Sequence, residues 1–188
     1  MSENTFINNF RSHLKTVNSH RLQVLKHCIK AGIIKRGLLH DLSKYSPAEF
    51  IPGVKHYQGT RSPNEREREL YGYSTAWMHH KGRNRHHFEY WNDYNPVTRR
   101  VEPVPMPDIF IFEMFCDRVA ASKIYNKDNY NNSMPLEYFM RGKNRRFIHK
   151  TTSAKIEFLL KMLSEHGEDY TFRYIRRQVK ILKAKGKI

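Results

Sequence analysis

A histidine and an aspartate follow an apolar run in the first quarter of the sequence. In GLLHDLSKY (residues 37–45), His40 and Asp41 stand directly behind two leucines. A charged side chain is rarely buried without a partner, so an Asp at this place predicts that something positive lies beside it. A metal ion is one candidate for that partner.

Four of the eleven histidines cluster further along the chain. The segment HHKGRNRHH contains His79, His80, His86 and His87 within nine residues. Imidazoles combined with carboxylates suit Mn, Fe, Co, Ni or Zn, whereas Mg and Ca prefer all-oxygen sites. Taken alone, the segment has a simpler interpretation, which is a basic loop whose histidines are exposed or cap a helix.

A carboxylate is also expected on the buried face of a later helix. In PDIFIFEMFCDRVAASKIY, positions 110, 114, 117, 121 and 124 share one helix face, and Asp117 is the charged residue on it. A buried Asp must be protonated, paired or bound to a metal. Arg118 does not supply the pair, because adjacent helical residues point about 100° apart. His20, beside Leu22 and Val24, raises the same question on an earlier helix, where a half-buried histidine with satisfied hydrogen bonds is the alternative.

Helices are predicted for the elements that carry these residues. Apolar residues at three- and four-residue spacing indicate a long helix over residues 5–30 that ends near Gly32. Ser46-Pro47-Ala48-Glu49 and Ser62-Pro63-Asn64-Glu65 each predict a helix start, with a Ser cap, Pro at the first position and Glu completing a capping box. Further helices are expected at about 107–125, 151–165 and 169–184.

No strand pairs are predicted. The proline-containing stretch 94–107 is expected to be an extended or irregular loop, and 126–135 a turn-rich connector. The chain has 188 residues, 39% of them apolar and 13% aromatic, which is enough for one hydrophobic core. We therefore predict an all-α single domain over residues 1–188, with a core of about 5–165 and a basic C-terminal helix or tail of about 169–188.

The charge balance favours anionic partners. Lys and Arg outnumber Asp and Glu by 34 to 18, which gives a net charge of +16 and a field that attracts polyanions or phosphorylated small molecules. The tail from Arg173 to Lys187 carries seven cations and no acid. A solvated, partly frayed helix is the usual explanation of such a run, and nucleic-acid contact is the less common one.

Cysteine usage and the N-terminal segment indicate the compartment. Cys28 and Cys116 lie inside apolar helical patterns, which is typical of reduced thiols rather than of a disulfide framework. MSENTFINNF lacks the features of a signal peptide, and no apolar run approaches the roughly 18 residues of a membrane span. We expect a cytoplasmic protein that does not bind membranes. The sequence does not set its oligomeric state.

The order of the candidate ligands resembles that of a known enzyme superfamily. His20 with Val24 four residues later, then His40 and Asp41, then Asp117 in CDRVAAS, are similar to the H…HD…D order of the HD-domain metal-dependent phosphohydrolases. This resemblance covers about residues 13–125. It implies an HD-like helical bundle.

Two further resemblances concern the segments between these ligands. HDLSK is similar to the HD-x-x-K form found in several branches of the superfamily, and His79-His80 falls where the binuclear branches have extra histidines. The chain also resembles an uncharacterised bacterial and phage family of unknown function at GLLHDLSKYSPAEF, GYSTAWMHHKGRNRHHFEYW and CDRVAASKIY. That match spans most of the chain and supplies no activity.

The superfamily resemblance implies a centre with one or two divalent transition metals. His20, His40 and Asp117 would hold the first, with Asp41 binding or bridging it and orienting a water. Members of the pairs His79/His80 and His86/His87 would complete a second site. The ligand from the first helix is expected to be His20 rather than His13 or His27, because His20 fits the H-x3-V pattern. His40 and Asp41 are expected beside Asp117 in space.

Basic residues near these ligands are candidates for substrate contacts. Lys44 is expected to act with Asp41 in catalysis, and Lys81, Arg83 and Arg85 are candidate phosphate clamps, the arginines because their planar fork binds two oxygens at once. Ordinary surface charge is the alternative explanation of each one.

The function expected from these observations is hydrolysis of a nucleotide or other small phosphate ester by a metal-activated water. One rival is a nucleic-acid-binding protein that uses the basic tail and the HHKGRNRHH loop, and salt-dependent binding without metal would favour it. The other rival is an HD-like module that binds metal without catalysis. Metal binding without turnover would favour that one.

Overall fold

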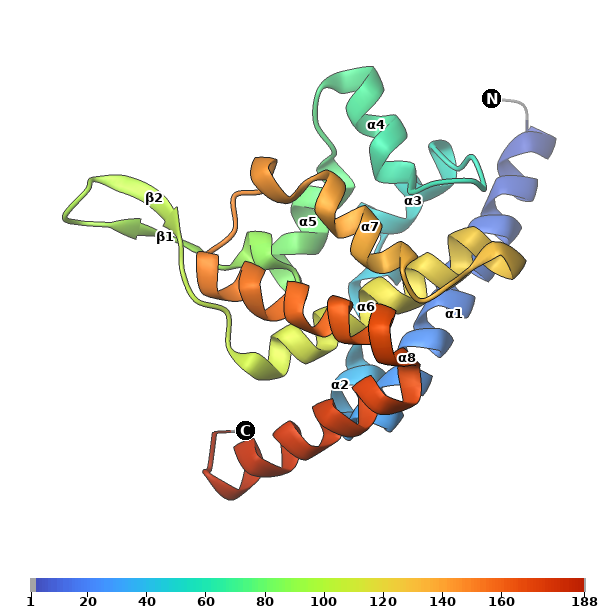
Figure 1. Cartoon of the computed structure of the whole chain (residues 1–188). Coiled ribbons are helices and arrows are strands. Elements are labelled where there is room, and N and C mark those ends of the chain that lie inside the picture. Colours follow the sequence, from blue (N-terminus) through green and yellow to red (C-terminus); the bar gives the residue numbers. More distant parts are fainter. Residues whose placement is uncertain (1–2, 188) are drawn as a thin grey trace.

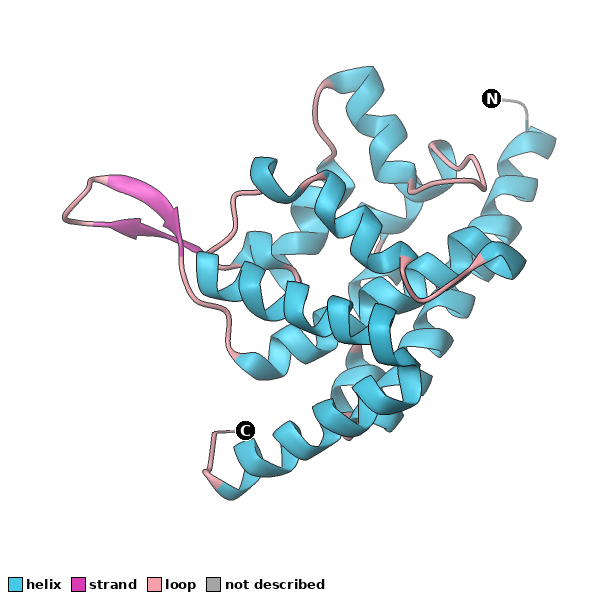
Figure 2. Ribbon diagram, viewed as in Figure 1, coloured by secondary structure: helices cyan, strands magenta, loops and turns pink. Residues whose placement is uncertain are grey.

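The computed structural model describes residues 3–187, which form eight α-helices and one two-stranded sheet (Figure 1, Figure 2). The helices are α1 (Glu3–Ala31), α2 (Ile34–Leu39), α3 (Pro47–Lys55), α4 (Pro63–Tyr71), α5 (Thr75–Arg83), α6 (Asp108–Asn126), α7 (Met134–Arg141) and α8 (Lys150–Ala184). Short 3-10 helices span Leu42–Tyr45, Phe88–Tyr90, Lys127–Asn129 and Lys143–Arg145. The prediction of a mostly all-α single domain is confirmed. No helix within residues 3–187 is long and apolar enough to cross a membrane.

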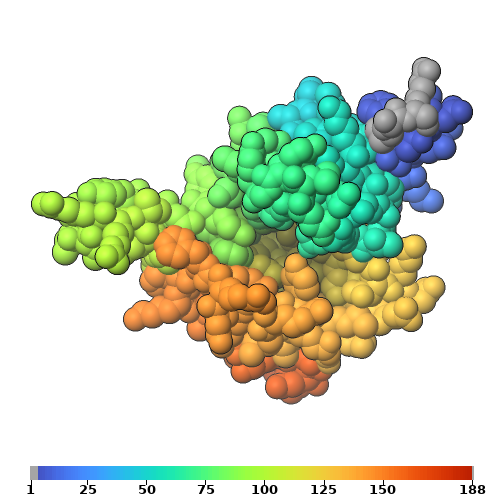
Figure 3. Space-filling model, turned by 90° about the horizontal axis from the view of Figure 1, so that it is seen from above, coloured from blue at the N-terminus to red at the C-terminus, as the bar shows by residue number. Residues whose placement is uncertain are grey.

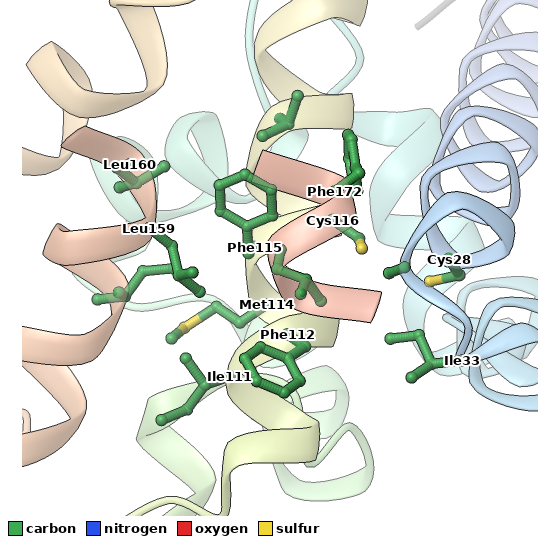
Figure 4. Close-up of a cluster of buried hydrophobic side chains, with 14 of the residues drawn as sticks. Cys28, Ile33, Ile111, Phe112, Met114, Phe115, Cys116, Leu159, Leu160 and Phe172 are labelled. Carbon is green, nitrogen blue, oxygen red and sulfur yellow. The ribbon is translucent and has the colours of Figure 1, made fainter. Parts of the chain in front are cut away.

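Helix α6 is the centre of the hydrophobic core and packs against both α1 and α8. On one side, Phe115 of α6 lies toward Leu160 of α8 (Figure 4). On the other side, Cys116 lies toward Cys28 of α1, and both cysteines are free thiols (Figure 4). A helix held on two faces in a close-packed core cannot shift without disturbing its neighbours. The polar residues of α6 are therefore held in fixed positions.

The C-terminal helix α8 has two halves that meet at a glycine. Gly167 has φ 78° and ψ 177°, which lie outside the helical region, so the helices predicted at about 151–165 and 169–184 are the two halves of α8. The second half contributes Phe172, Ile175 and Val179 to the main core. The core therefore extends beyond residue 165, into the segment that carries the basic tail.

A β-hairpin projects from the helical body, so the prediction of no strand pairs is wrong. Strands β1 (Asn92–Asn95) and β2 (Arg100–Pro103) pair in antiparallel fashion within the stretch predicted as an irregular loop (Figure 2). The connecting turn is fixed locally, because the Asn95 side chain accepts a hydrogen bond from the Val97 amide at 2.9 Å and Arg99 adopts φ 55°. Four-residue strands without a buried side chain leave no alternating apolar pattern to detect.

The two predicted capping boxes are right in position and wrong in their contacts. Ser46 and Ser62 precede the first prolines of α3 and α4, but neither serine side chain caps its helix. Glu49, predicted as a capping residue, instead faces His79 and His80. Its carboxylate therefore belongs to the polar cluster described below.

His27 on α1 is a buried neutral histidine. It is 1% exposed, and its Nδ1–H donates to the carbonyl oxygen of Cys116 at 3.1 Å. Its Nε2 accepts a hydrogen bond from the Gln23 amide at 2.9 Å. Burial lowers the pKa of His27 from 6.5 to about 4, so the imidazole is uncharged at neutral pH.

We expect this histidine to make the fold sensitive to acid. Between pH 6.5 and 4 the unfolded chain binds a proton at His27 that the folded chain excludes, so stability falls as the pH falls through this window. In His27→Asn, whose amide can donate to the same carbonyl, the loss between pH 7 and pH 5 should be smaller by about 2 kcal/mol. Urea unfolding with a chelator present measures this difference. Equal pH dependence in both proteins would contradict the neutral assignment.

Candidate metal centre

Asp41 lies where the predicted ligands from three elements meet. Its Oδ2 is 3.7 Å from Nε2 of His20 on α1 and 3.3 Å from Nε2 of His40, the residue after α2. Oδ1 of Asp117 on α6 is 3.0 Å from the same nitrogen of His20 and 3.8 Å from that of His40. The expected proximity of His40, Asp41 and Asp117 is therefore found. His27 faces Cys116 and Phe172 instead of this group.

The other carboxylate oxygen of Asp41 faces a second group of histidines. Its Oδ1 is 3.3 Å from Nε2 of His80 on α5 and 3.3 Å from Nε2 of His86. Nε2 of His87 lies 2.9 Å from Nε2 of His80. Asp41 thus stands between two clusters, with one oxygen directed to each.

Several atoms of these clusters lack a hydrogen-bond partner. Buried Nε2 atoms of His20, His40 and His86, together with Oδ1 of Asp41, form no hydrogen bond of acceptable geometry with the described residues. Buried polar atoms are normally satisfied, so convergent imidazole nitrogens and a carboxylate oxygen without partners have the chemistry of a set of metal ligands. Within residues 3–187, three sets have ligand atoms within 4.8 Å of one another: Asp41/His80/His86/His87, His20/His40/Asp41 and His40/His86/Glu113. These groups could hold a metal ion.

Glu113 on α6 orients one histidine from each cluster. Its Oε1 lies 3.1 Å from Nδ1 of His40 and 3.3 Å from Nδ1 of His86, while its Oε2 accepts a hydrogen bond from Nε of Arg36 at 2.6 Å. A carboxylate that holds the Nδ1–H of a histidine leaves the Nε2 lone pair free to bind a metal. Glu113 was not among the residues predicted from the sequence. The available signal was its position four residues before Asp117, on the same side of a buried helix.

Glu49 on α3 plays the same part for His80. Its Oε2 lies 2.7 Å from Nδ1 of His80, and its Oε1 lies 2.7 Å from Nδ1 of His79. His79 is therefore turned toward Glu49, and it belongs to none of the sets that could hold a metal. Of the predicted pair His79/His80, therefore, His80 faces Asp41 and His79 does not.

The backbone around Asp41 is strained and held from α1. Asp41 adopts φ 53° and ψ 28°, a left-handed conformation that is uncommon for residues other than glycine. Arg21 fixes the preceding turn, because its Nε donates to the carbonyl of His40 at 2.8 Å and its Nη2 donates to that of Leu38 at 3.0 Å. The helix that carries His20 thus also positions the His40-Asp41 pair.

Charge is concentrated at this point of the interior. Burial alone would raise the pKa of Asp41 and Asp117, but neighbouring histidines, with Lys44 beside Asp41, hold both pKa values well below the usual range. Burial opposes ionisation of Glu113 too, yet hydrogen bonds from His40 and His86 lower its pKa to about 2. For His40, burial lowers the pKa, and the carboxylates outweigh it and raise the pKa to about 10. The buried carboxylates of Asp41, Asp117 and Glu113 thus strongly favour the binding of positive charge beside them.

The predicted basic residues are placed differently from one another. Nζ of Lys44 lies 2.7 Å from Oδ2 of Asp41, and its side chain is 31% exposed. Lys81 lines a cavity described below. Arg83 and Arg85 are exposed, with Arg83 bonded to the carbonyl of its own helix and Arg85 over the ring of Tyr90. Within the described residues, only Lys44 among these four contacts Asp41.

The sequence pattern of one protein family matches residues 9–162. The chain belongs to DUF5662, a family of unknown function. The match includes every member of both clusters around Asp41 and both carboxylates that orient them. No curated protein and no solved structure matches this DUF5662 chain.

We expect Glu113→Gln to weaken metal binding by about 10- to 100-fold, because the variant loses the carboxylate that orients His40 and His86. Glu137→Gln, at an exposed position on α7, is the matched control and should bind metal as the wild type does. Competition with a fluorescent zinc chelator measures all three affinities. Unchanged affinity in folded Glu113→Gln would show that this carboxylate does not position the ligands.

Proposed function

We propose that this protein is a metal-dependent phosphohydrolase of the HD-like type, acting on a nucleotide or another small phosphate ester. The observation that carries the proposal is the position of Asp41, whose two carboxylate oxygens face two separate histidine clusters. An arrangement of this kind suits two cations held on a shared carboxylate. The H…HD…D order of the sequence supports the same proposal.

The donor atoms suit divalent transition metals such as Mn, Fe, Co, Ni or Zn, because imidazole nitrogens outnumber carboxylate oxygens. The first ion would be held by His20, His40, Asp41 and Asp117. The second would be held by Asp41, His80, His86 and His87. When bound, such ions lower the pKa of a coordinated water and stabilise the charge that develops on phosphoryl oxygens.

The residues of the chain contribute binding and orientation. Lys44 holds its ammonium group 2.7 Å from Asp41 and is partly open to solvent, so it can meet a phosphate oxygen that approaches the centre. Asp117, with 15% of its side chain exposed, lies on the accessible side of the first cluster. Figure 3 shows the surface hollowed between the green segment of α4 and α5 and the orange segment of α7. A small substrate fits this approach better than a folded macromolecule does.

We expect the wild type to bind two metal ions per chain. Asp41→Asn should lose both, because the shared carboxylate serves both clusters, whereas His87→Gln should retain one. His27→Asn changes a buried histidine that faces neither cluster and should retain two. Mass-spectrometric metal analysis of untagged protein gives these numbers. A single ion in the wild type, or two ions in Asp41→Asn, would contradict the shared-carboxylate arrangement.

We expect Asp41→Asn to abolish phosphoester turnover with little loss of fold, because the change keeps the side-chain volume and removes the charge. Arg176→Ala, at an exposed position in the second half of α8, should leave turnover of small substrates nearly unchanged. Hydrolysis of a nucleotide panel with Mn, Co, Ni and Zn, beside thermal stability, tests both variants. Full activity in folded Asp41→Asn would contradict the proposed mechanism. Polyanion binding lost through Arg176→Ala, with no hydrolysis in the wild type, would support the nucleic-acid-binding rival.

A further inference from the structure

A cavity of about 360 Å³ lies next to the second histidine cluster along the chain. Among the residues that line it are Lys81, which follows His80, and Phe88, which follows His87. Its other wall comes from the segment after α7, with Arg146 and Phe147. This volume lies within the range of small-molecule sites.

Three basic residues line the cavity: Lys81, Arg145 and Arg146. Arg118 on α6 is not part of the lining, but its guanidinium carbon and that of Arg146 lie over the same ring, that of Phe139, at 5.8 Å and 4.9 Å from its centre. Nε of Arg118 is buried and has no hydrogen-bond partner among the described residues. Burial and the charge of Arg118 lower the pKa of Arg146. Glu89, which also lines the cavity, offsets part of the charge of Arg118, Arg146 and Lys81. Within residues 3–187, no carboxylate lies at ion-pair distance from any of these three cations, so an anion would relieve the remaining charge.

The lining of the cavity also includes oxygen atoms that need donors. Oε2 of Glu89 and Oδ1 of Asn92 are buried and have no hydrogen-bond partner among the described residues. The Asn92 amide nitrogen already donates to the carbonyl of Glu89 at 2.8 Å, which leaves its oxygen as an acceptor. A ligand that satisfies both the basic residues and these oxygen atoms carries an anionic group together with hydroxyl or amino groups.

We propose that this cavity binds a phosphate group carried by a hydroxyl- or amino-bearing molecule, with Arg146 and Lys81 contacting the phosphate and Arg118 adding positive charge from behind Arg146. Glu89 and Asn92 accept hydrogen bonds from the rest of the ligand. The binding is a property of the cavity alone. If the protein has the proposed function, the cavity would hold a second anionic group of the substrate, while the phosphate that is hydrolysed lies at Asp41. This second role rests on the proposed function.

The test uses the full chain with a chelator present, so that no metal contributes to binding. Isothermal titration with inorganic phosphate and with ribose 5-phosphate should show tighter binding of ribose 5-phosphate, because it also supplies hydroxyl donors. Arg146→Gln and Lys81→Met should each weaken binding of both probes by about tenfold or more. Glu89→Leu should remove the advantage of ribose 5-phosphate over inorganic phosphate. Arg176→Gln, with the same loss of charge as Arg146→Gln on an exposed helix face, should bind both probes as the wild type does.

Three results would overturn the proposal. The first is no binding of either probe at millimolar concentration, and the second is equal affinity of the wild type and Lys81→Met. The third is a loss of affinity in Arg176→Gln as large as that in Arg146→Gln, which would show that the net charge of the protein, and not the cavity, binds the probes. Lys81→Met is essential because Arg146 also donates to the carbonyls of Phe139 and Tyr138, so its replacement can disturb α7. Failure of metal binding or hydrolysis leaves this test unaffected. If the wild type hydrolyses phosphate esters and Arg146→Gln and Lys81→Met bind phosphate as the wild type does, the proposed role of the cavity is wrong and the proposed function is unaffected.

Discussion

The buried carboxylate of Asp41 is the constraint on which the rest of the site depends. It is 1% exposed and ionised, which is costly in a protein interior unless positive charge surrounds it. Its left-handed backbone directs one oxygen toward His20 and His40 and the other toward His80 and His86. The four histidines come from separate parts of the chain, so this one carboxylate requires α1, α2, α5 and the turn after α5 to meet at a single point.

Helix α6 joins this polar point to the hydrophobic core. The same nineteen-residue helix supplies Phe115 to the core, Asp117 to the first cluster and Glu113 to both clusters. Since α6 is packed between α1 and α8, the energy that holds its apolar residues also holds its carboxylates in place. Loss of packing around Phe115 would therefore also displace the carboxylates that orient the ligand histidines.

The sequence predicted the long helices and most members of the two clusters, because periodic apolar residues and the order of His and Asp are visible in one dimension. It did not predict Glu113 or Glu49 as partners of histidines, since a carboxylate that orients a ligand has no spacing rule linking it to a histidine thirty or seventy residues away. Nor did it separate His79 from His80. Adjacent residues of α5 point in different directions, and only the position of α3 decides which of them faces Asp41.

The electrostatics of the molecule work at two ranges. A net charge of +16 attracts phosphate compounds from a distance, yet the carboxylates of Asp41, Asp117 and Glu113 would repel them at the centre itself. The positive charge of Lys44 offsets part of this repulsion, because Lys44 contacts Asp41 and remains partly exposed. A cation bound among the histidines would offset the remaining repulsion, so that the centre would attract phosphate instead of repelling it. Under the proposed function, the basic residues Lys81, Arg145 and Arg146 that line the cavity would extend this attraction beyond the centre, so the charges that draw an anion to the surface would also determine where it binds.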